Sequence, residues 1–414
     1  MDRKQYCVKL SVQPSRGLVD EKFIVLVQNV SPGFQMTIHA LHKCEDGHSY
    51  EAFAHYTANA TGTVNVSEDP SLGGTYSGVE QMGLLWSLRP VPGTKPGLRL
   101  RKVNVQTPME VTISVYQGHQ TEGFMDQVPL VGVLVERWYM APRVRRIPIT
   151  ENGLTATLFL PSGRTRGESG GRCAVGGAQT AYRVLEQHPQ VLGSRIAMLG
   201  LSLGASVTLK MAVYSQVMKL RCVVCISGCH VQPIDGFLEE LLNFCRINSE
   251  TKTRINEEDQ VIYHDLLLPI PTDPALKVDV GRLQCPLLLI VGEDDQNWPC
   301  LRVCNRCEFT DMTTSCVNNK LGPKMKEMME KAGNSHLLTV LSYPNAGHLI
   351  EPPYTPHTRA TAFLSVTSVK KVMALWGGET VAHSRAQEDC LEEDADLSEG
   401  ESVRQLKLRV LNNK

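Results

Sequence analysis

The residues GLSLG at positions 200–204 constrain this chain more than any other stretch, because of the patterns on either side of them. The apolar run RIAML at 195–199 is typical of a strand, and the segment LGASVTLKMAVYSQVMKL at 203–220 is typical of a helix. A G-x-S-x-G pattern alone often arises by chance. Between a strand and a helix it predicts a sharp turn that holds Ser202 exposed, with Gly200 and Gly204 at positions that have no room for a side chain.

Strand-like and helical patterns alternate from about residue 148 onward. We predict strands at 155–161, 222–227, 286–292 and 337–344, and helices at 177–189 and 324–333. This alternation is typical of a mostly parallel sheet covered by helices, and the unbroken apolar runs suit strands that are buried on both faces. The stretch 229–285 shows no readable template and is predicted to be a loop, with Asp235 and Asp259 on its solvated surface.

Residues 4–148 follow a different pattern, with short β-branched and aromatic runs separated by Pro, Gly, Asn and Asp. The clearest runs are at 22–30, 34–42, 109–118 and 130–138. They predict an all-β, sandwich-like domain in which Trp86 anchors the core. Because 414 residues exceed the size of one ordinary core, we predict an all-β domain at 1–147, an α/β domain at 148–386 and an acidic, disordered tail at 387–414.

Composition favours small-molecule chemistry. The net charge of −1 gives no electrostatic reason to expect a nucleic-acid partner, and no apolar stretch is long enough to span a membrane. The first residues lack a secretory or organelle-targeting pattern, and the last three, Asn-Asn-Lys, are not a peroxisomal signal, so we expect a cytoplasmic protein. In that reducing compartment its 13 cysteines are expected to be thiols.

Ser202 needs a base and an orienting acid farther along the chain, because a serine hydroxyl is a weak nucleophile. Asp294 and Asp295 follow the predicted strand at 286–292, and His348 lies in a loop after the strand at 337–344. All three groups are therefore expected at the carboxyl ends of parallel strands, where such sheets build their sites. We favour Asp295 as the acid for its reach past Gly292, with Asp294 as the alternative.

Four cysteines in the stretch 298–320 invite comparison with a zinc site: Cys300, Cys304, Cys307 and Cys316. Their C-x3-C-x2-C-x8-C spacing is not that of a standard zinc knuckle, so we predict a loop with ordinary thiols and no metal. This stretch lengthens the connection between the acid and the histidine.

Several motifs together resemble the family of acyl-CoA thioesterases and bile acid-CoA:amino acid N-acyltransferases. They are MGLLWSLRP in the first half and GLSLG, VGEDDQNW, AGHLIEPPY and WGGE in the second. The resemblance extends over most of residues 5–388. It implies a β-rich domain followed by an α/β-hydrolase domain, which acts on acyl-CoA thioesters through a nucleophile, acid and histidine. Those roles fall here on Ser202, Asp295 and His348, with no metal or redox cofactor.

The segment 162–176 is shorter than an α/β hydrolase needs at this point. SGRTRGESGGRCAVG is polar and lacks a strand-forming run, whereas one or two sheet strands and an oxyanion loop are expected there. The backbone N–H of Leu203 is then the one oxyanion donor that the sequence predicts. Losing a second donor typically slows turnover by about 10²- to 10³-fold.

Three functions follow from these features. The first is hydrolysis of fatty acyl-CoA to free fatty acid and coenzyme A, which a serine nucleophile favours because water readily resolves its oxygen ester. The second is transfer of the acyl group to an amino acid. The third is acyl-CoA binding without turnover, motivated by the short segment 162–176. The acyl chain preference and the oligomeric state are not readable from the sequence.

Overall fold

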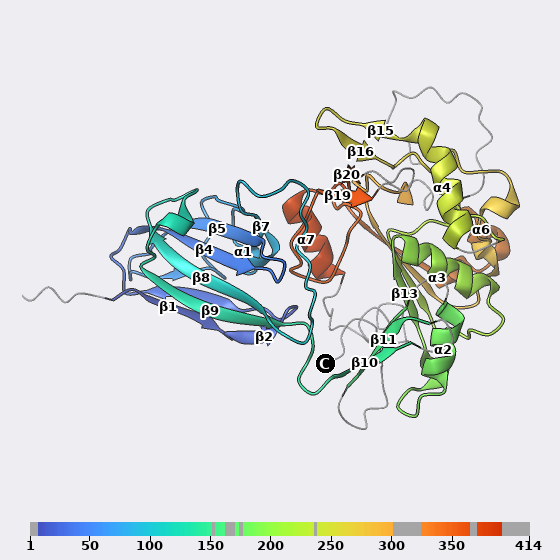
Figure 1. The fold of residues 1–414 in the computed structure, drawn as a ribbon, viewed down its shortest axis with the longest axis horizontal. Helices are drawn as coiled ribbons and strands as arrows, with labels where there is room; N and C mark the ends of the chain where they lie inside the picture. Colours follow the sequence, from blue (N-terminus) through green and yellow to red (C-terminus); the bar gives the residue numbers. More distant parts are fainter. Residues whose placement is uncertain are drawn as a thin grey trace, which may run out of the picture. The chain divides into compact units, whose positions relative to one another are not determined.

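The computed structural model describes residues 7–150, 154–161, 170–173, 177–235, 238–300, 324–364 and 371–390. The chain divides into two compact units (Figure 1). The first comprises Met1–Ala141 and Glu351–Thr358, and the second comprises Pro142–Ile350 and Arg359–Lys414. The division thus lies a few residues before the expected boundary at 147, which falls inside strand β10 (Arg145–Ile149). Across the described residues, no helix has both the length and the apolar character needed to cross a membrane.

The first unit is built from two β-sheets. A six-stranded sheet has the order β2-β9-β8-β4-β5-β7, and a three-stranded sheet has the order β1-β3-β6. The strands are β1 (Lys9–Gln13), β2 (Arg16–Leu18), β3 (Ile24–Gln28), β4 (Gln35–Lys43), β5 (Ser49–Thr57), β6 (Val64–Asn65), β7 (Arg89–Pro90), β8 (Met109–Gln117) and β9 (Val131–Trp138). Two short helices, α1 (Gly83–Trp86) and η1 (Phe124–Asp126), complete the unit.

Alternating burial explains why these runs form strands. In β3 the side chains of Val25 and Val27 are fully buried, while their neighbours along the strand are more exposed, as expected for a strand with one face on a core. The four runs predicted from the sequence correspond to β3, β4, β8 and β9, which confirms them. Trp86 is also confirmed as a core residue, since it is buried and packs at a tilt against the ring of Tyr76.

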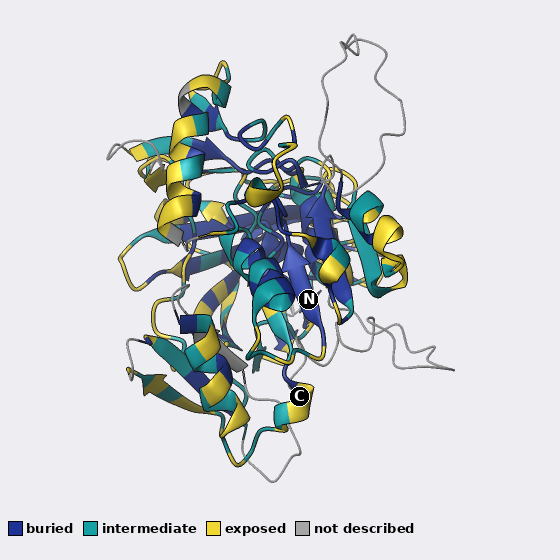
Figure 2. Ribbon diagram, turned by 90° about the vertical axis from the view of Figure 1, so that its right-hand side faces the viewer, coloured by how far each residue is buried: buried dark blue, intermediate teal, exposed yellow. Residues whose placement is uncertain are grey.

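The second unit contains a parallel sheet of four strands in the order β13-β14-β17-β18. They are β13 (Met198–Leu201), β14 (Val223–Ile226), β17 (Leu287–Gly292) and β18 (Leu338–Tyr343). Every residue of β14 and β17 is buried, as predicted for strands covered on both faces (Figure 2). The sheet places the carboxyl ends of all four strands at one edge, where the loops that follow them meet.

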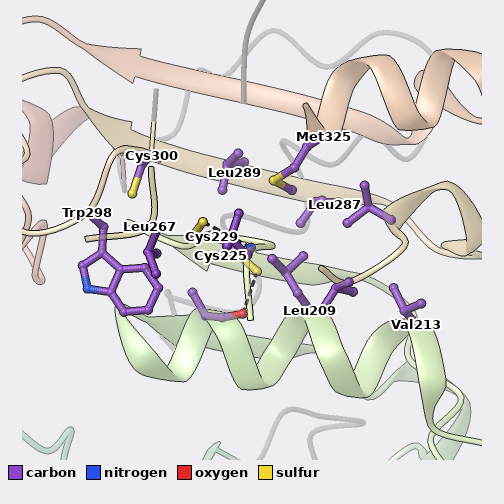
Figure 3. Packing of buried hydrophobic residues seen from close by; sticks show 14 of the residues in the cluster. Leu209, Val213, Cys225, Cys229, Leu267, Leu287, Leu289, Trp298, Cys300 and Met325 are labelled. Atoms are coloured by element: carbon purple, nitrogen blue, oxygen red, sulfur yellow. Dashed lines mark hydrogen bonds between the residues drawn. The ribbon is translucent and has the colours of Figure 1, made fainter. Parts of the chain in front are cut away.

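Helices flank this sheet and supply its apolar packing (Figure 1). They are α2 (Ala178–Glu186), α3 (Leu203–Tyr214), α4 (Leu238–Lys252), α6 (Met325–Ala332) and α7 (Thr380–Asp389), with 3-10 turns η3 (Gly193–Arg195), η4 (Pro274–Leu276), η5 (Val280–Arg282) and η6 (Ser335–Leu337). Figure 3 shows Leu209 and Val213 of α3 packing toward the strands, in one buried cluster with Leu287 and Leu289 of β17. The cluster holds α3, and therefore its first turn, firmly against the sheet.

Two smaller sheets complete the second unit. β10, β11 (Ala156–Leu160) and β12 (Gly170–Cys173) form an antiparallel sheet, whereas β15 (Arg254–Ile255), β16 (Gln260–Ile262), β19 (Ala360–Leu364) and β20 (Lys371–Leu375) form a mixed one. β11 confirms the strand predicted at 155–161. It does not join the parallel sheet, because its partners are β10 and β12.

The structure corrects several expectations. The segment 162–176 does contain a strand: β12, whose backbone pairs with β11 although its residues GGRC lack β-forming side chains. The predicted loop at 229–285 contains α4, whose Leu241 and Cys245 are buried one helical turn apart. Helix α3 ends at Tyr214, before the predicted end at residue 220, because Ser215 is extended and its hydroxyl accepts from the backbone of the following turn.

The C-terminal tail begins later than the sequence predicts. The sequence predicts a disordered tail from residue 387, but helix α7 continues to Asp389, and Ala386 is buried against the parallel sheet. Residues 391–414, with the acidic run, lie outside the described residues.

Candidate active site

Ser202 occupies the turn between β13 and α3 in a strained backbone conformation. Its φ of 56° and ψ of −120° lie in a region that residues with a side chain rarely adopt. The backbone N–H of Ser202 donates to the carbonyl of Ile226 at 2.9 Å, which continues the pairing of β13 with β14. The strain is therefore held by the sheet on one side and by α3 on the other. This places the Ser202 side chain at the amino end of α3, where helix dipole and free N–H groups favour negative charge.

Gly200 and Gly204 differ in how much room they have. A Cβ on Gly200 would lie 2.2 Å from the carbonyl oxygen of Gly204, so this position admits no side chain. A Cβ on Gly204 would meet no heavy atom of the described residues within 4 Å. The expectation that Gly204 has no room is therefore wrong within the described part of the chain. The physical reason is an apolar cavity of about 180 Å³ between α2, β13 and α3, which Gly204 lines.

His348 connects the serine to the acid. Its Nε2 lies 2.7 Å from the Oγ of Ser202, and its Nδ1 lies 2.8 Å from Oδ2 of Asp295. His348 is fully buried and Asp295 is 2% exposed, so the contact between these two side chains is shielded from water. The carboxylate accepts the Nδ1 proton, which leaves the lone pair of Nε2 available to the serine hydroxyl. Residues 202, 295 and 348, predicted from three separate parts of the sequence, thus form one chain of hydrogen bonds.

The two adjacent aspartates have different partners. Asp295 accepts from the backbone N–H groups of Asn297 and Trp298, both at 2.8 Å, through the oxygen that does not face His348. Asp294 accepts instead from Arg359 Nη1 at 3.0 Å and from the N–H of Gly378 at 2.8 Å. The structure therefore places Asp295 on the histidine and excludes Asp294, the alternative, from that contact.

Four side chains that contact His348 or Asp295 were not singled out from the sequence. Ser227, with φ of 49°, donates its hydroxyl proton to the carbonyl oxygen of His348 at 2.6 Å. The ring of Trp376 stacks on the imidazole at 5.6 Å, and His264 donates from Nδ1 to the carbonyl of Asp295 at 2.6 Å. Asn297 is the fourth, with Nδ2 at 3.1 Å from Nε2 of His348. Trp376 belongs to the motif WGGE and Asn297 to the motif VGEDDQNW, so these two motifs are the sequence features that could have pointed to both residues.

The glycines of WGGE allow the loops of the site to approach each other. Gly377 has φ of 77°, and a Cβ there would overlap the carbonyl oxygen of Asp294. A Cβ on Gly347 would lie 2.4 Å from the carbonyl oxygen of Gly377. Close packing of these three backbone segments therefore explains why this motif contains glycine.

The residue expected to donate to the oxyanion, Leu203, begins helix α3. A backbone N–H at this first position has no acceptor within the helix, so it is free to bind an anion, and its oxyanion role stays a prediction. A second donor is expected from an oxyanion loop, for which the sequence predicts the segment 162–176 to be too short. Residues 162–169 and 174–176 of that segment lie outside the described residues.

Cys300 contacts the acid. Its Sγ donates to Oδ2 of Asp295 at 3.4 Å, inside the buried cluster seen at the left of Figure 3. Cys304, Cys307 and Cys316, the other members of the group compared with a zinc site, lie outside the described residues. None of the nine cysteines whose side chains are described forms a disulfide.

Comparison with known families finds two matches that follow one another along the chain. Residues 20–151 match the model described as the acyl-CoA thioester hydrolase/BAAT N-terminal region, and residues 178–395 match the BAAT / acyl-CoA thioester hydrolase C-terminal model. The two matches leave out residues 152–177, the stretch that contains the short segment discussed above.

Curated relatives are similar over most of their length. The chain is 30% identical over 427 residues to the peroxisomal succinyl-coenzyme A thioesterase of Mus musculus, covering 92% of this chain and 93% of that protein. It is 29% identical over 423 residues to the mouse acyl-coenzyme A thioesterase 2, mitochondrial, covering 92% and 86%. It is 27% identical over 430 residues to the mouse bile acid-CoA:amino acid N-acyltransferase, covering 92% and 94%. These relatives differ in location, so the cytoplasmic location stays a prediction.

Proposed function

Because the chain belongs to the acyl-CoA thioester hydrolase and bile acid-CoA:amino acid N-acyltransferase family, we propose that it hydrolyses acyl-CoA thioesters, with Ser202, His348 and Asp295 as its catalytic groups. The observation that carries this proposal is the unbroken chain of contacts from the carboxylate of Asp295 through His348 to the hydroxyl of Ser202. The three groups come from loops that follow three strands of one sheet. Together they supply the nucleophile, the base and the acid that acyl transfer requires.

In the proposed acylation step, Ser202 Oγ attacks the thioester carbonyl while His348 Nε2 takes its proton. Asp295 holds the imidazole in the required tautomer and stabilises the imidazolium. The N–H of Leu203 donates to the oxyanion. The C–S bond then breaks, and the proton on Nε2 passes to the departing sulfur of coenzyme A. These steps use only side chains and backbone of this chain, so the proposal includes no metal or redox cofactor.

Gly204, two residues along the chain from Ser202, lines an apolar cavity that could receive an acyl chain. The cavity that Gly204 lines is bordered mainly by apolar side chains of α2, β13 and α3. We propose fatty acyl-CoA as the substrate class on this basis. The acceptor in the second step is water, because the acyl-enzyme of a serine is an oxygen ester that a histidine-activated water resolves readily.

The test is release of free coenzyme A from palmitoyl-CoA, measured by thiol detection against the background of the protein's own cysteines. We expect Ser202→Ala to abolish the release and Ser77→Ala, a change at an exposed serine of the first unit, to leave it unchanged. Release that is equal in the native protein and in Ser202→Ala would contradict the proposal. Acyl-CoA binding without release would favour the binding function instead.

Transfer to an amino acid is the second candidate, supported by the similarity to the N-acyltransferase. The same assay distinguishes it when glycine or taurine is added. Formation of an N-acyl amino acid, detected by mass, would assign the transferase activity. We expect free fatty acid to remain the main product.

A further inference from the structure

The side chain of Asn297 and the nucleophile Ser202 both contact the same nitrogen atom of His348. Its Nδ2 lies 3.1 Å from Nε2 of His348, the same atom that the Oγ of Ser202 contacts at 2.7 Å. The position is fixed by the backbone, because the N–H of Asn297 donates to Oδ1 of Asp295 at 2.8 Å. Asn297 is thus anchored to the acid while its amide reaches the reactive side of the base.

Nε2 of a neutral imidazole has one lone pair, so the hydroxyl of Ser202 and the amide of Asn297 cannot both use it fully. Proton transfer from Ser202 needs that lone pair during acylation. The contact with Asn297 therefore does not help the first step. The contact shows instead that the amide of Asn297 lies beside Nε2, where it remains once Ser202 has been esterified.

The space around Nε2 has few other polar neighbours. One face of the imidazole is covered by the ring of Trp376, and the ring itself is fully buried. Within the described part of the chain, Ser202 and Asn297 are the side chains that hydrogen-bond to Nε2. A molecule that replaces the serine proton on Nε2 must therefore enter next to the amide of Asn297, which offers both a donor and an acceptor.

We infer that Asn297 positions the acceptor of the acyl group in the second half of the reaction. This inference rests on the proposed function. A water molecule held by the amide donates one proton to Nε2 while its oxygen attacks the ester carbonyl carbon. When the tetrahedral intermediate collapses, the bond from the carbonyl carbon to Ser202 Oγ breaks. Nε2 returns the proton to Oγ, and the carboxylic acid leaves.

The role predicts a specific kinetic change. Asn297→Ala removes a group used in deacylation and leaves the contact between Ser202 and His348 in place. We expect acylation to change by less than about twofold and deacylation to slow by about five- to tenfold, the effect of one hydrogen bond of ordinary net strength. Acyl-enzyme then accumulates on Ser202.

The experiment uses 4-nitrophenyl butyrate, whose good leaving group makes acylation fast. Rapid mixing gives the burst of nitrophenolate, which reports acylation, and the steady rate that follows, which reports deacylation. Mass measurement after acid quenching gives the fraction of acylated Ser202. Asn297→Leu, which has nearly the same size, is the second variant in case alanine disturbs folding. Asn248→Ala is the matched control, because the amide of Asn248 donates to the carbonyl of Phe244 in the same helix, α4.

The expected result is a full burst with a slower steady rate and more acyl-enzyme in both Asn297 variants. Equal slowing of the burst and the steady rate would overturn the inference, because Asn297 would then act on His348 in both steps. Unchanged kinetics would overturn it as well. A native protein that shows neither a burst nor a difference from Ser202→Ala would indicate that the proposed function itself is wrong, an outcome distinct from the other two.

Discussion

At the residue scale, the two adjacent aspartates provide the sharpest comparison. Asp295 faces His348, whereas Asp294 faces Arg359 and Gly378. We expect Asp295→Asn to lower kcat by about 10⁴-fold, because an amide there favours the wrong imidazole tautomer. Asp294→Asn leaves the tautomer unchanged, so its kcat is expected to stay within about threefold of the native value. The measurement is steady-state release of coenzyme A by the two variants.

The Asp294 variant also has an expected effect on stability. Its ion pair with Arg359 is half exposed and contributes little, but the bond from the N–H of Gly378 is also weakened. We expect a loss of about 1 kcal/mol in the free energy of unfolding, measured in urea. If Asp294→Asn lost as much activity as Asp295→Asn, the assignment of the acid would be wrong.

At the element scale, the turn between β13 and α3 sets opposite requirements for its two glycines. Gly200→Ala places a Cβ against the backbone of Gly204 and Ala205, which cannot move aside without displacing the first turn of α3. We expect a loss of at least about 2 kcal/mol in stability, together with loss of activity. Gly204→Ala places its Cβ in open space, so we expect equal or slightly higher stability, because alanine favours the helix.

The measurements are the thermal unfolding temperature and the rate of coenzyme A release of Gly200→Ala and Gly204→Ala. An equal loss of stability and activity in both variants would mean that the space at Gly204 is not open in solution. The outcome therefore also tests whether the cavity beside α2 and α3 is open in solution.

At the scale of the whole molecule, stability is expected to depend on pH through the first unit. Burial lowers the pKa of His42, partly offset by its bond to the carbonyl of Glu110. Burial, followed by the nearby His119, lowers the pKa of His55. Both rings stay neutral in the folded protein at a pH where the unfolded chain begins to bind protons, near the ordinary value of 6.5.

The stabilising contribution of these two rings is therefore complete above about pH 6.5 and decreases as the pH falls below it. We expect the melting temperature to fall between pH 7.5 and pH 5, measured by circular dichroism. The double variant His42→Gln and His55→Gln is expected to show a smaller fall over the same range. An unchanged slope would mean that other groups cause the pH dependence.

Much of the fold was predictable because strands and helices follow from local patterns of apolar residues. The runs that became β3, β4, β8, β9, β14, β17 and β18 bury side chains at spacings visible in the sequence. Several other elements were not predicted, and for two of them the local reason is clear. β12 consists of Gly-Gly-Arg-Cys and is a strand through its backbone pairing with β11, and α4 has few buried residues to mark its apolar face.

The sequence by itself determined the type and order of the main elements and placed Ser202, His348 and the aspartate pair after the strands that carry them. Only the tertiary structure decided that Asp295 and not Asp294 contacts His348, and that Asn297 reaches Nε2. It also decided that Ser227 bonds the backbone of His348 and that Trp376 stacks on its imidazole. The physical reason is that element type depends on neighbours a few residues away, which the sequence displays. Hydrogen bonds in the site depend on the directions of side chains from loops far apart in the chain, which only the packed backbone sets.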